Sequence, residues 1–352
     1  MNDEIKKCRK QIDAIDKKIV ELLHKRAKNV LKIASIKQKE KVKIYDPARE
    51  STILKKIKKG AFPEVAIKNV FNEIFSASRY LQKKVYVAYL GPVASFCHMA
   101  AMKRFGKMTQ YLPFNSIKDV FMEVEKGNAD YGCVPIENST EGAVNYTYDM
   151  FVDSDLKICS EIILDINHCL LSKEKNIKNI TQIFSHPQSF AQCRNWLESN
   201  LPGVKLIEVS SNSKGAELAT KTAKSAAIAG ELAASTYGLN ILATNIQDMA
   251  DNVTRFFIIG NQLNKKTSED KTSIMVSIKD KVGALYSLLR PFQKYGINLT
   301  NIESRPSKKK AWDYLFFVDF QGHLDEKKVC KALEEVKKEC GAIKILGSYP
   351  KF

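Results

Sequence analysis

The first forty residues of the chain place an apolar side chain at every third or fourth position, which is the period of an α-helix. The pattern continues from about residue 3 to residue 40 without a proline or glycine. At a rise of about 1.5 Å per residue, it predicts a helix roughly 55 Å long. Such a helix is too long to bury its apolar stripe inside a small domain of its own, so we expect a helical partner. The stripe consists of Ile5, Cys8, Ile12, Ile15, Ile19, Leu22, Leu23, Ala27, Val30 and Ala34.

Two further helices are expected after this stripe. Asp46 and Pro47 supply an N-cap residue followed by a proline at the first helical position. A third helical pattern runs from about Glu64 to Lys83. Three helices in 84 residues form little hydrophobic core alone. We therefore predict an all-α domain over residues 1–84 that is intertwined with a second copy in a homodimer.

The hydrophobic pattern of the sequence changes over residues 85–263, where short β-rich runs alternate with helical patterns. This alternation predicts an α/β domain with largely parallel sheets. In such folds ligands bind at the loops that leave the carboxyl ends of the strands. The length suits two lobes with a cleft between them. The β-rich runs are VYVAYL, YGCVPI, IFSH, KLIEVS, NILAT and RFFIIG.

A polar segment without periodicity, NQLNKKTSED at 261–270, is typical of a linker. The elements predicted after it follow a βαββαβ order, which is the α+β ferredoxin-like arrangement. The predicted domains are thus 1–84, 85–263 and 264–352. The last one comprises strand 272–279, helix 283–294, strands 297–304 and 311–320, helix 326–339 and strand 342–349.

Composition places the chain among ordinary globular proteins, with 44% hydrophobic and 27% charged residues in 352. It contains no apolar run near the roughly 18 residues of a membrane span, and no apolar signal segment follows its charged start. Its eight cysteines form no C-x-x-C pair, so we expect reduced thiols and no metal site. A cytoplasmic protein without membrane association is expected.

The net charge of +17 is concentrated at the start of the chain. Residues 1–84 hold 23 lysines and arginines against 10 acidic residues, a net of +13. A basic segment suits nucleic acid, an acidic lipid surface or a small polyanionic substrate, and charge alone does not choose among them.

Eight polar residues of this basic segment stand in the same order as in the small helical chorismate mutases of the bacterial bifunctional type. Arg26 and Lys37 lie 11 residues apart, which returns to within about 20° of the same helix face. Arg9 lies about 100° away from that face, and in the family the partner subunit supplies this arginine. The eight residues are Arg9, Arg26, Lys37, Asp46, Arg49, Glu50, Ser78 and Gln82.

The resemblance implies the rearrangement of chorismate, a dicarboxylate, to prephenate without a cofactor or nucleophile. Such an enzyme must hold one conformer and stabilise negative charge on the ether oxygen. The resemblance implies that Arg9 and Arg26 bind the carboxylates, and that Lys37 and Gln82 donate hydrogen bonds to the ether oxygen. It also implies that Asp46 and Glu50 contact the hydroxyl side of the substrate. Arg49 and Ser78 would complete the pocket. Lys37, Glu50 and Gln82 are the predicted catalytic residues.

Residues 85–263 resemble prephenate dehydratase over their full length. The resemblance rests on VPIENSTEGAV at 134–144, SHPQSFAQCRNWL at 185–197 and GLNILATNIQDMADNVTRFFII at 238–259. It implies a carbon–oxygen lyase that removes carbon dioxide and the ring hydroxyl from prephenate. The substrate-binding residues carried over are Glu137, Asn138, Ser139, Ser185, His186, Gln192, Thr254 and Arg255.

This elimination is driven by aromatisation, so the catalyst need only hydrogen-bond the departing hydroxyl and orient two carboxylates. We expect the hydroxyl of Thr254 to be the donor and Arg255 to pair with a carboxylate. Asn138, Ser185 and Gln192 are expected to complete the polar lining.

One loop departs from the pattern of that family. The first strand usually ends in Gly-Pro-x-Gly followed by Ser or Thr, whereas this chain reads Gly91-Pro92-Val93-Ala94-Ser95. Losing the second glycine removes backbone freedom, so the sequence does not determine the backbone path of this loop. Ser95 is still expected at the cleft.

Residues 264–352 resemble an ACT-type amino-acid-sensing domain in two stretches, with Trp312, Asp313 and Tyr314 downstream. The family binds L-phenylalanine there, at a dimer interface, as a feedback inhibitor. Such regulation requires that phenylalanine bind one quaternary state better than another. The implied effector-binding residues are Gly283, Ala284, Leu285, Glu303, Ser304, Arg305 and Pro306.

Together these resemblances imply a cytoplasmic bifunctional enzyme of phenylalanine biosynthesis, a homodimer or larger homo-oligomer, that needs no cofactor. One alternative keeps the fold and takes arogenate in place of prephenate. Another is an amino-acid-responsive nucleic-acid-binding regulator, but the basic segment has no helix-turn-helix signature and its arginines fall at pocket positions. A two-lobed solute-binding protein is a third alternative for the middle region, against which the expected lack of an export signal argues.

Overall fold

The computed structural model describes residues 3–40, 42–278, 282–306 and 314–351. The chain packs as two compact units. The first comprises Met1–Asp46, Ile57–Val85 and Phe105–Thr109, and the second comprises Pro47–Lys56, Tyr86–Arg104 and Gln110–Phe352. In the described ranges, no helix is both long enough and apolar enough to cross a membrane.

The first unit is helical, as predicted. Helix α1 (Asp3–Glu40) is one long, gently curved helix, and α3 (Glu64–Gln82) packs against it. Only Val30 is buried among the residues of α1, all of which are described. The apolar stripe therefore stays largely exposed, with Leu22 at 62%.

The second unit begins with α2 (Pro47–Lys55), where the sequence predicts a helix start, and continues into a six-stranded sheet. Three helices cover this sheet, and its core is built from side chains such as Phe121, Phe151 and Phe257. The strands, in spatial order, are β2 (Gln110–Phe114), β1 (Tyr86–Leu90), β3 (Tyr131–Asn138), β11 (Val253–Gly260) and β5 (Lys157–Asp165), with β4 (Gly142–Ala143) beside β3. The helices are α4 (Phe96–Phe105), α5 (Ile117–Glu125) and α6 (Asn145–Asp153).

A five-stranded sheet forms the second lobe, around a core of small apolar side chains such as Ala216, Ala227 and Ala229. Its strands, in spatial order, are β10 (Asn240–Ala243), β6 (Cys169–Ser172), β9 (Ser225–Ala229), β7 (Gln182–Ser185) and β8 (Lys205–Glu208). Its helices are η1 (Ile177–Asn179), α7 (Pro187–Gln192), α8 (Arg194–Asn200), α9 (Asn212–Lys221) and α10 (Glu231–Tyr237).

The prediction of largely parallel sheets is corrected by the structure, because both sheets are mixed. Strands β1, β2 and β3 are parallel, and so are β7, β8 and β9. However, the chain returns from the second lobe through β11, which inserts between β3 and β5 and runs antiparallel to both. Strand β6 is likewise antiparallel to β9 and β10.

The third sheet is four-stranded and antiparallel, and it confirms the predicted βαββαβ order. Two helices pack on one face around Leu288, Phe292 and Val318. The strands are β13 (Leu299–Pro306), β14 (Tyr314–Gln321), β12 (Asp270–Ile278) and β15 (Ala342–Pro350), and the helices are α11 (Ala284–Lys294) and α12 (Lys327–Glu339). Trp312 and Asp313, singled out in the sequence, lie outside the described residues.

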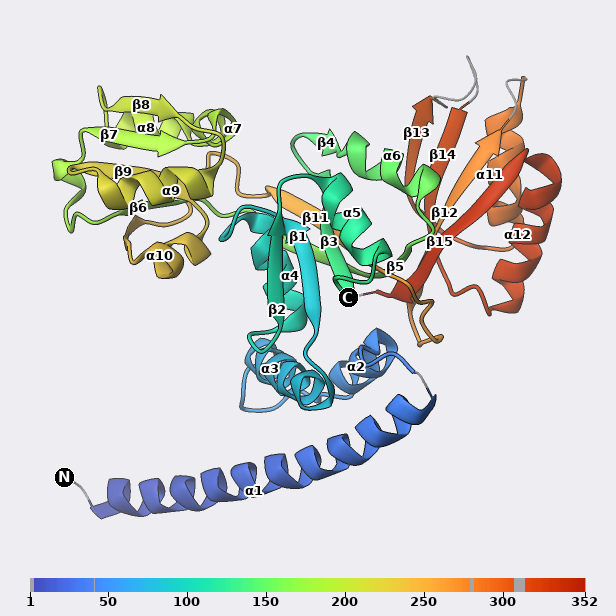
Figure 1. Cartoon of the computed structure of the whole chain (residues 1–352), viewed down its shortest axis with the longest axis horizontal. Coiled ribbons are helices and arrows are strands. Elements are labelled where there is room, and N and C mark those ends of the chain that lie inside the picture. The colour runs from blue at the N-terminus through green and yellow to red at the C-terminus, as the bar shows by residue number, and fades with distance from the viewer. Residues whose placement is uncertain (1–2, 41, 279–281, 307–313, 352) are drawn as a thin grey trace. The chain divides into compact units, whose positions relative to one another are not determined.

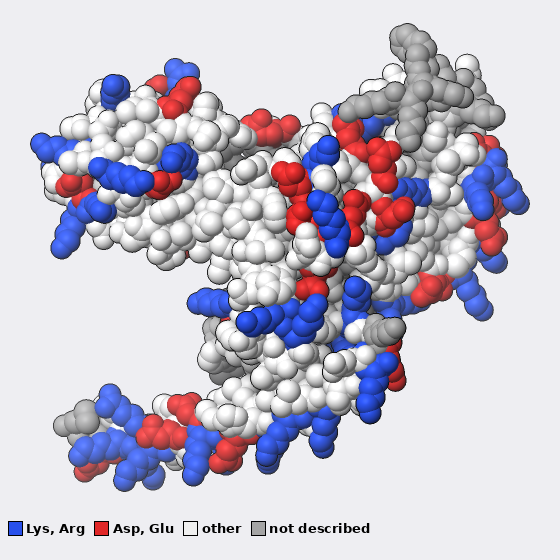
Figure 2. Space-filling model, viewed as in Figure 1, with Lys and Arg blue, Asp and Glu red and all other residues white. Residues whose placement is uncertain are grey.

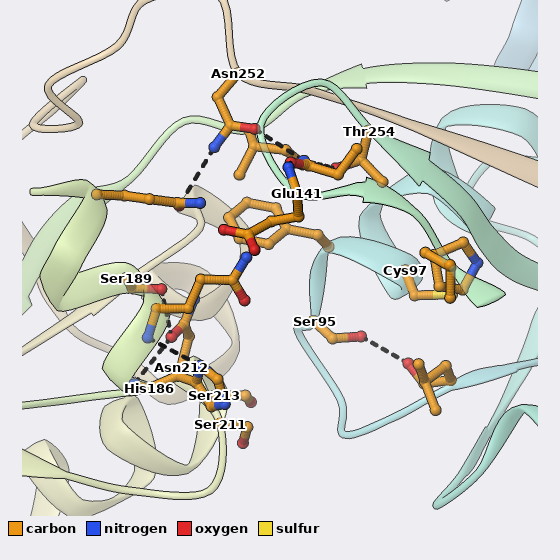
Figure 3. Close-up of a pocket in the computed structure, with 18 of the residues that line it drawn as sticks. Ser95, Cys97, Glu141, His186, Ser189, Ser211, Asn212, Ser213, Asn252 and Thr254 are labelled. Atoms are coloured by element: carbon orange, nitrogen blue, oxygen red, sulfur yellow. Dashed lines mark hydrogen bonds between the residues drawn. The ribbon is translucent and has the colours of Figure 1, made fainter. Parts of the chain in front are cut away.

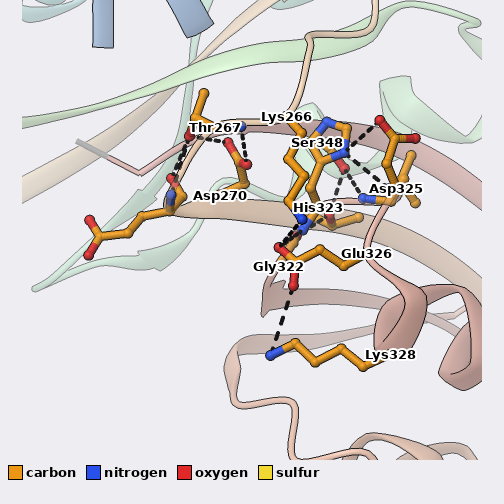
Figure 4. Close-up of polar contacts among 12 residues, drawn as sticks. Lys266, Thr267, Asp270, Gly322, His323, Asp325, Glu326, Lys328 and Ser348 are labelled. Carbon is orange, nitrogen blue, oxygen red and sulfur yellow. Dashed lines mark hydrogen bonds and ion pairs between the residues drawn. The ribbon is translucent and has the colours of Figure 1, made fainter. Parts of the chain in front are cut away.

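The third sheet packs directly on the first, with β15 against β5. Gly347 allows this approach, because a Cβ there would collide with the carbonyl oxygen of Ile158. The segment predicted as a linker is irregular but anchored, as Figure 4 shows around Thr267. The side chain and backbone N–H of Thr267 donate to Asp270, both at 2.7 Å, and Nε2 of His323 donates to the Asn264 carbonyl at 3.1 Å.

Candidate active sites

A groove of about 660 Å³ lies between α1 and α3 in the first unit. Its lining is mostly apolar and includes Arg26 from α1 and Ser78 from α3, which the sequence assigned to one pocket. A guanidinium nitrogen of Arg26 donates to the Ser78 hydroxyl, and that hydroxyl donates to the Ile74 carbonyl at 2.5 Å. The charged head of Arg26 lies over the ring of Phe75, 5.9 Å from its centroid. The groove thus combines an apolar wall with a fixed guanidinium.

Lys37 and Gln82, the predicted hydrogen-bond donors to the ether oxygen, belong to the two helices that form this groove, α1 and α3. Neither is among the residues that line it. Nζ of Lys37 donates to the carbonyls of Lys43 and Ile44 at 3.0 and 2.9 Å. Gln82 donates from Nε2 to the Ser78 carbonyl at 3.0 Å, while its Oε1 is buried and makes no hydrogen bond to the described residues. Their catalytic roles stay predictions.

The remaining predicted mutase residues are divided between the two units. Arg9 lies on the same helix as Arg26, 17 residues earlier, which at 1.5 Å per residue separates them by about 25 Å. Asp46 ends the first unit, whereas Arg49 and Glu50 belong to the second. There Arg49 is exposed, and Glu50 is buried with its carboxylate 3.8 Å from Arg104.

A second cavity, of about 480 Å³, lies between the first and second sheets. Figure 3 shows its polar lining, with Asn252 and Thr254 on one side and His186, Ser189 and Asn212 on the other. Several of the residues that line it stand at or just after the carboxyl ends of strands, such as Asn138 at the end of β3 and His186 after β7. Of the predicted dehydratase residues, the cavity brings together Asn138, His186, Gln192 and Thr254, and it also includes Ser95.

The hydroxyl of Thr254 has a fixed hydrogen-bond polarity. Oδ1 of Asn138 accepts from the backbone N–H groups of Thr140 and Glu141 at 3.0 and 3.1 Å. Backbone N–H groups only donate, so these two bonds fix which end of the Asn138 amide carries the oxygen. The other end, Nδ2, donates to Oγ1 of Thr254 at 2.7 Å. The threonine oxygen therefore accepts from Asn138, and its own proton is left for another acceptor.

Three of the polar lining residues that sequence reasoning missed are Asn252, His168 and Asn212. Asn252 donates from Nδ2 to Oε1 of Gln192 at 3.3 Å, and His168 bonds the same oxygen at 2.8 Å. Asn252 lies two residues before Thr254, so the alternation along the strand could have found it. Asn212 begins a helix after a strand and could have been found by the same strand-end rule. His168 belongs to no motif that would single it out.

Four predicted residues do not line the cavity. Ser185 is fully buried beneath it, and its hydroxyl reaches the Ile228 carbonyl at 2.9 Å and Oδ1 of Asn212 at 3.0 Å. The hydroxyl of Ser139 donates to the Asp251 carbonyl at 2.9 Å. The Glu137 side chain is 43% exposed. Ser185 therefore shapes the wall through Asn212.

Arg255, the fourth, faces the third sheet. Its guanidinium donates to Glu161 at 2.9 Å, to Asp319 at 2.6 Å and to the Tyr349 hydroxyl at 3.2 Å. Burial would lower the pKa of Arg255, but Asp319 and Glu161 raise it further, so the group stays charged. Its role as a carboxylate ligand is a prediction that no observation tests.

The loop that departs from the family pattern keeps the conformation for which glycine is favoured. Ala94 has a φ of +63°, in the left-handed region, at the position where the family usually has the second glycine. The backbone N–H of Ala94 donates to Nδ1 of His98 at 3.1 Å, and the Ser95 hydroxyl donates to the Leu90 carbonyl at 3.0 Å. These bonds hold the loop beside the cavity.

The two predicted effector stretches lie in the third domain. Gly283, with a φ of +78°, precedes α11, and Ala284 and Leu285 begin that helix. Glu303–Pro306 ends β13, and Arg305 pairs there with Asp149 of α6 at 3.0 Å.

The fold and its two pockets define a multidomain enzyme with an attached ferredoxin-like domain. Known protein families match it in the same order: chorismate mutase type II over residues 8–83, prephenate dehydratase over 87–264 and the ACT domain over 272–338. The bifunctional chorismate mutase/prephenate dehydratase of Aquifex aeolicus is 51% identical, covering 99% of this chain and 98% of that one. That of Pseudomonas aeruginosa is 46% identical with the same coverage.

A solved prephenate dehydratase from Arthrobacter aurescens, in complex with L-Phe, matches with a TM-score of 0.70 at 34% identity. It covers 76% of this chain and 90% of its own. The chain belongs to the bifunctional chorismate mutase/prephenate dehydratase family, with both enzymatic domains and an ACT domain in one polypeptide. The prediction that it is an enzyme of this kind is confirmed.

Proposed function

We propose that the pocket between the first two sheets dehydrates prephenate to phenylpyruvate, with Thr254 as the hydrogen-bond donor to the departing ring hydroxyl. The observation that carries this role is the 2.7 Å hydrogen bond in which Thr254 accepts from Asn138. As the bond to the carboxylate carbon breaks, its electrons flow into the ring and expel the hydroxyl, which takes up a proton and leaves as water. Donation from Thr254 stabilises the negative charge that develops on that oxygen.

The substrate carboxylates are bound by neutral donors. No lysine or arginine is among the described residues that line the cavity. The N-terminal ends of α4 and α9 open onto it through Ser95 and Ser213, and helix N-termini favour anions. Gln192 and His186 add side-chain groups from the same lobe as α9.

Arogenate is a second candidate substrate, and Glu141 favours it. This carboxylate lines the cavity and lies, in Figure 3, between the Thr254 side and the Asn212 side. A negative charge there would attract the ammonium group of arogenate, whereas it would repel a prephenate carboxylate. Turnover of the two compounds measured side by side decides between them.

The mutase step is assigned to the groove of the first unit and requires a homodimer. Arg26 supplies one carboxylate ligand, whereas Arg9 lies about 25 Å along the same helix and serves a partner's groove. The exposed apolar stripe of α1 supports this pairing, since Ile12, Ile15 and Leu22 are each at least 55% exposed. On the face seen in Figure 2, acidic side chains are interspersed with basic ones along the N-terminal half of α1, whereas residues 22–39 carry basic side chains without acidic ones.

We assign residues 1–84, 85–263 and 264–352 to the mutase, dehydratase and regulatory domains, and the cytoplasm as their compartment. No cofactor is assigned to either reaction, because positioning and hydrogen-bond donors suffice for both.

The whole assignment is tested with purified protein and chorismate alone, following prephenate and phenylpyruvate over time. We expect both products in sequence, and less phenylpyruvate when L-phenylalanine is present. Accumulation of prephenate without phenylpyruvate would contradict the dehydratase assignment. If chorismate is not consumed while added prephenate is, the mutase assignment fails.

Phenylalanine feedback is proposed to reach the dehydratase pocket through α6. Arg305, in an effector stretch, pairs with Asp149 of this helix at 3.0 Å, and Asn301 donates to Tyr148 at 3.3 Å. The residue that precedes α6, Val144, lines the cavity. A shift of the effector stretch would therefore move the turn between Asn138 and α6.

Replacing Asp149 with asparagine tests this connection. The variant keeps the shape of the side chain but loses the ion pair, so we expect phenylalanine to inhibit about 3- to 30-fold less effectively. Uninhibited turnover of prephenate should be unchanged. The control is Glu335→Gln, which removes a 2.6 Å ion pair with Lys294 inside the third domain. Equal inhibition of the Asp149 variant and the unmodified enzyme would exclude α6 as the connection.

A further inference from the structure

We propose that His168 is a positioning residue of the dehydratase pocket, which holds the Gln192 amide so that its N–H groups face the substrate. The inference rests on the proposed dehydratase function and goes beyond it, since nothing in the resemblance singles out this histidine. His168 is 1% exposed and lies in the loop between β5 and β6. Because so little of it reaches the cavity, it acts through Gln192.

Backbone donors fix the direction of each hydrogen bond in this network, and the bonds converge on Oε1 of Gln192. Asn138 is oriented by backbone donors and donates from Nδ2 to Oδ1 of Asn252 at 2.9 Å. That bond makes the other end of Asn252 the donor, and it reaches Gln192 at 3.3 Å. The atom of Gln192 that accepts it must be Oε1, which also bonds Nε2 of His168 at 2.8 Å. An amide oxygen only accepts, so Nε2 of His168 carries the proton.

This order fixes the orientation of Gln192 toward the pocket. With Oε1 held by two donors, the Nε2 amino group of Gln192 is the end left for the cavity, which Gln192 lines. This amino group makes no hydrogen bond with the described residues that would compete with a ligand. If the amide turned over, a carboxylate of the substrate would face an acceptor instead of a donor.

The surroundings of His168 keep its imidazole neutral and fixed in one orientation. Burial lowers the pKa of its imidazole, and the bond with Gln192 raises it by less. Nδ1 is buried without a hydrogen-bond partner among the described residues, and the Phe96 ring packs edge-on at 5.5 Å. The backbone N–H of His168 donates to Gln247 at 2.9 Å. A single N–H, aimed at one amide oxygen, is thus the polar function of this side chain.

The test compares His168→Leu and His168→Gln with Gln192→Ala and the double variant His168→Leu/Gln192→Ala. Removing the donor should lower kcat/KM for prephenate about 10- to 100-fold, mainly through KM, because Gln192 loses its orientation. Glutamine at 168 retains an N–H donor, so His168→Gln should restore at least half of the loss in the logarithm of kcat/KM that His168→Leu causes. The double variant should be no slower than Gln192→Ala, because His168 acts only through that amide.

Two controls separate this role from a general effect on folding. Chorismate conversion by the same chain should be unchanged in every variant. His323, another buried histidine that bonds a backbone carbonyl at 3.1 Å, lies in the third domain, and His323→Leu should leave the KM for prephenate unchanged. Losses that multiply in the double variant, or a His168→Leu enzyme with normal KM, overturn the inference. If the unmodified enzyme does not turn over prephenate, the proposed function itself fails instead.

Discussion

Replacing Thr254 with valine is expected to lower prephenate turnover by about 100- to 10,000-fold, the range that general acid catalysis contributes. Valine keeps the shape of the side chain but removes the hydroxyl that receives the Asn138 hydrogen bond at 2.7 Å. Without the hydroxyl, the proton that we assign to the departing oxygen is lost, and the amide N–H of Asn138 remains without its acceptor. The effect should appear in kcat, measured as phenylpyruvate formed from saturating prephenate.

A matched variant controls for the loss of a buried hydroxyl as such. Thr272 donates to the Gly322 carbonyl at 2.6 Å in the third domain, so Thr272→Val removes a similar bond far from the chemistry. Chorismate conversion provides the second control, since it should not change in either variant. Turnover within about threefold of the unmodified enzyme in Thr254→Val would remove Thr254 from the mechanism and leave the binding roles of Asn138 and Gln192 to be tested separately.

The sequence predicts the existence and type of most elements, because its apolar periods are long and unbroken. Helix α1 and the βαββαβ order are examples, and both are confirmed. The orientation of β11 was beyond such reasoning, since a strand that returns from another lobe has the same local pattern whichever way it enters the sheet. The strands that pair with β11 are distant in sequence and decide its orientation, and the local hydrophobic pattern carries no information about them.

The candidate site could be predicted in part for the same reason. Asn138 stands at the carboxyl end of β3, where α/β folds bind ligands. Thr254 stands at the amino end of β11 and reaches the same cavity because β11 runs antiparallel to β3. Thr254 and Arg255 are neighbours, but successive side chains of a strand face opposite sides, so one lines the cavity and the other meets the third sheet. His168 reaches the network only through a bond to Gln192, 24 residues away, and no local pattern encodes that contact.

Arg255→Met is expected to destabilise the protein by about 3–5 kcal/mol, the cost of removing one partner from a buried ion pair. Glu161 keeps the ammonium of Lys271 at 2.8 Å, so the charge left without a cation is that of Asp319, whose side chain is 7% exposed. Burial also raises the pKa of Tyr349, with Asp319 adding to the rise, so its phenol stays neutral and adds no second negative charge beside Asp319. Denaturant unfolding measures the loss. As a control, Arg194→Met removes an exposed 2.8 Å pair with Glu198 and should have little effect.

The second variant, Arg255→Met/Asp319→Asn, separates the two roles that Arg255 could have. If its function is to join β11 to the third sheet, removing the unpaired carboxylate should restore a large part of the stability, because the charge that caused the loss is gone. If Arg255 instead pairs with a substrate carboxylate, the single variant should raise the KM for prephenate while unfolding as the unmodified protein does. The added Asp319→Asn change would then recover nothing. The unfolding curve and KM of these two variants therefore decide whether the arginine beside Thr254 serves the substrate or the contact between domains.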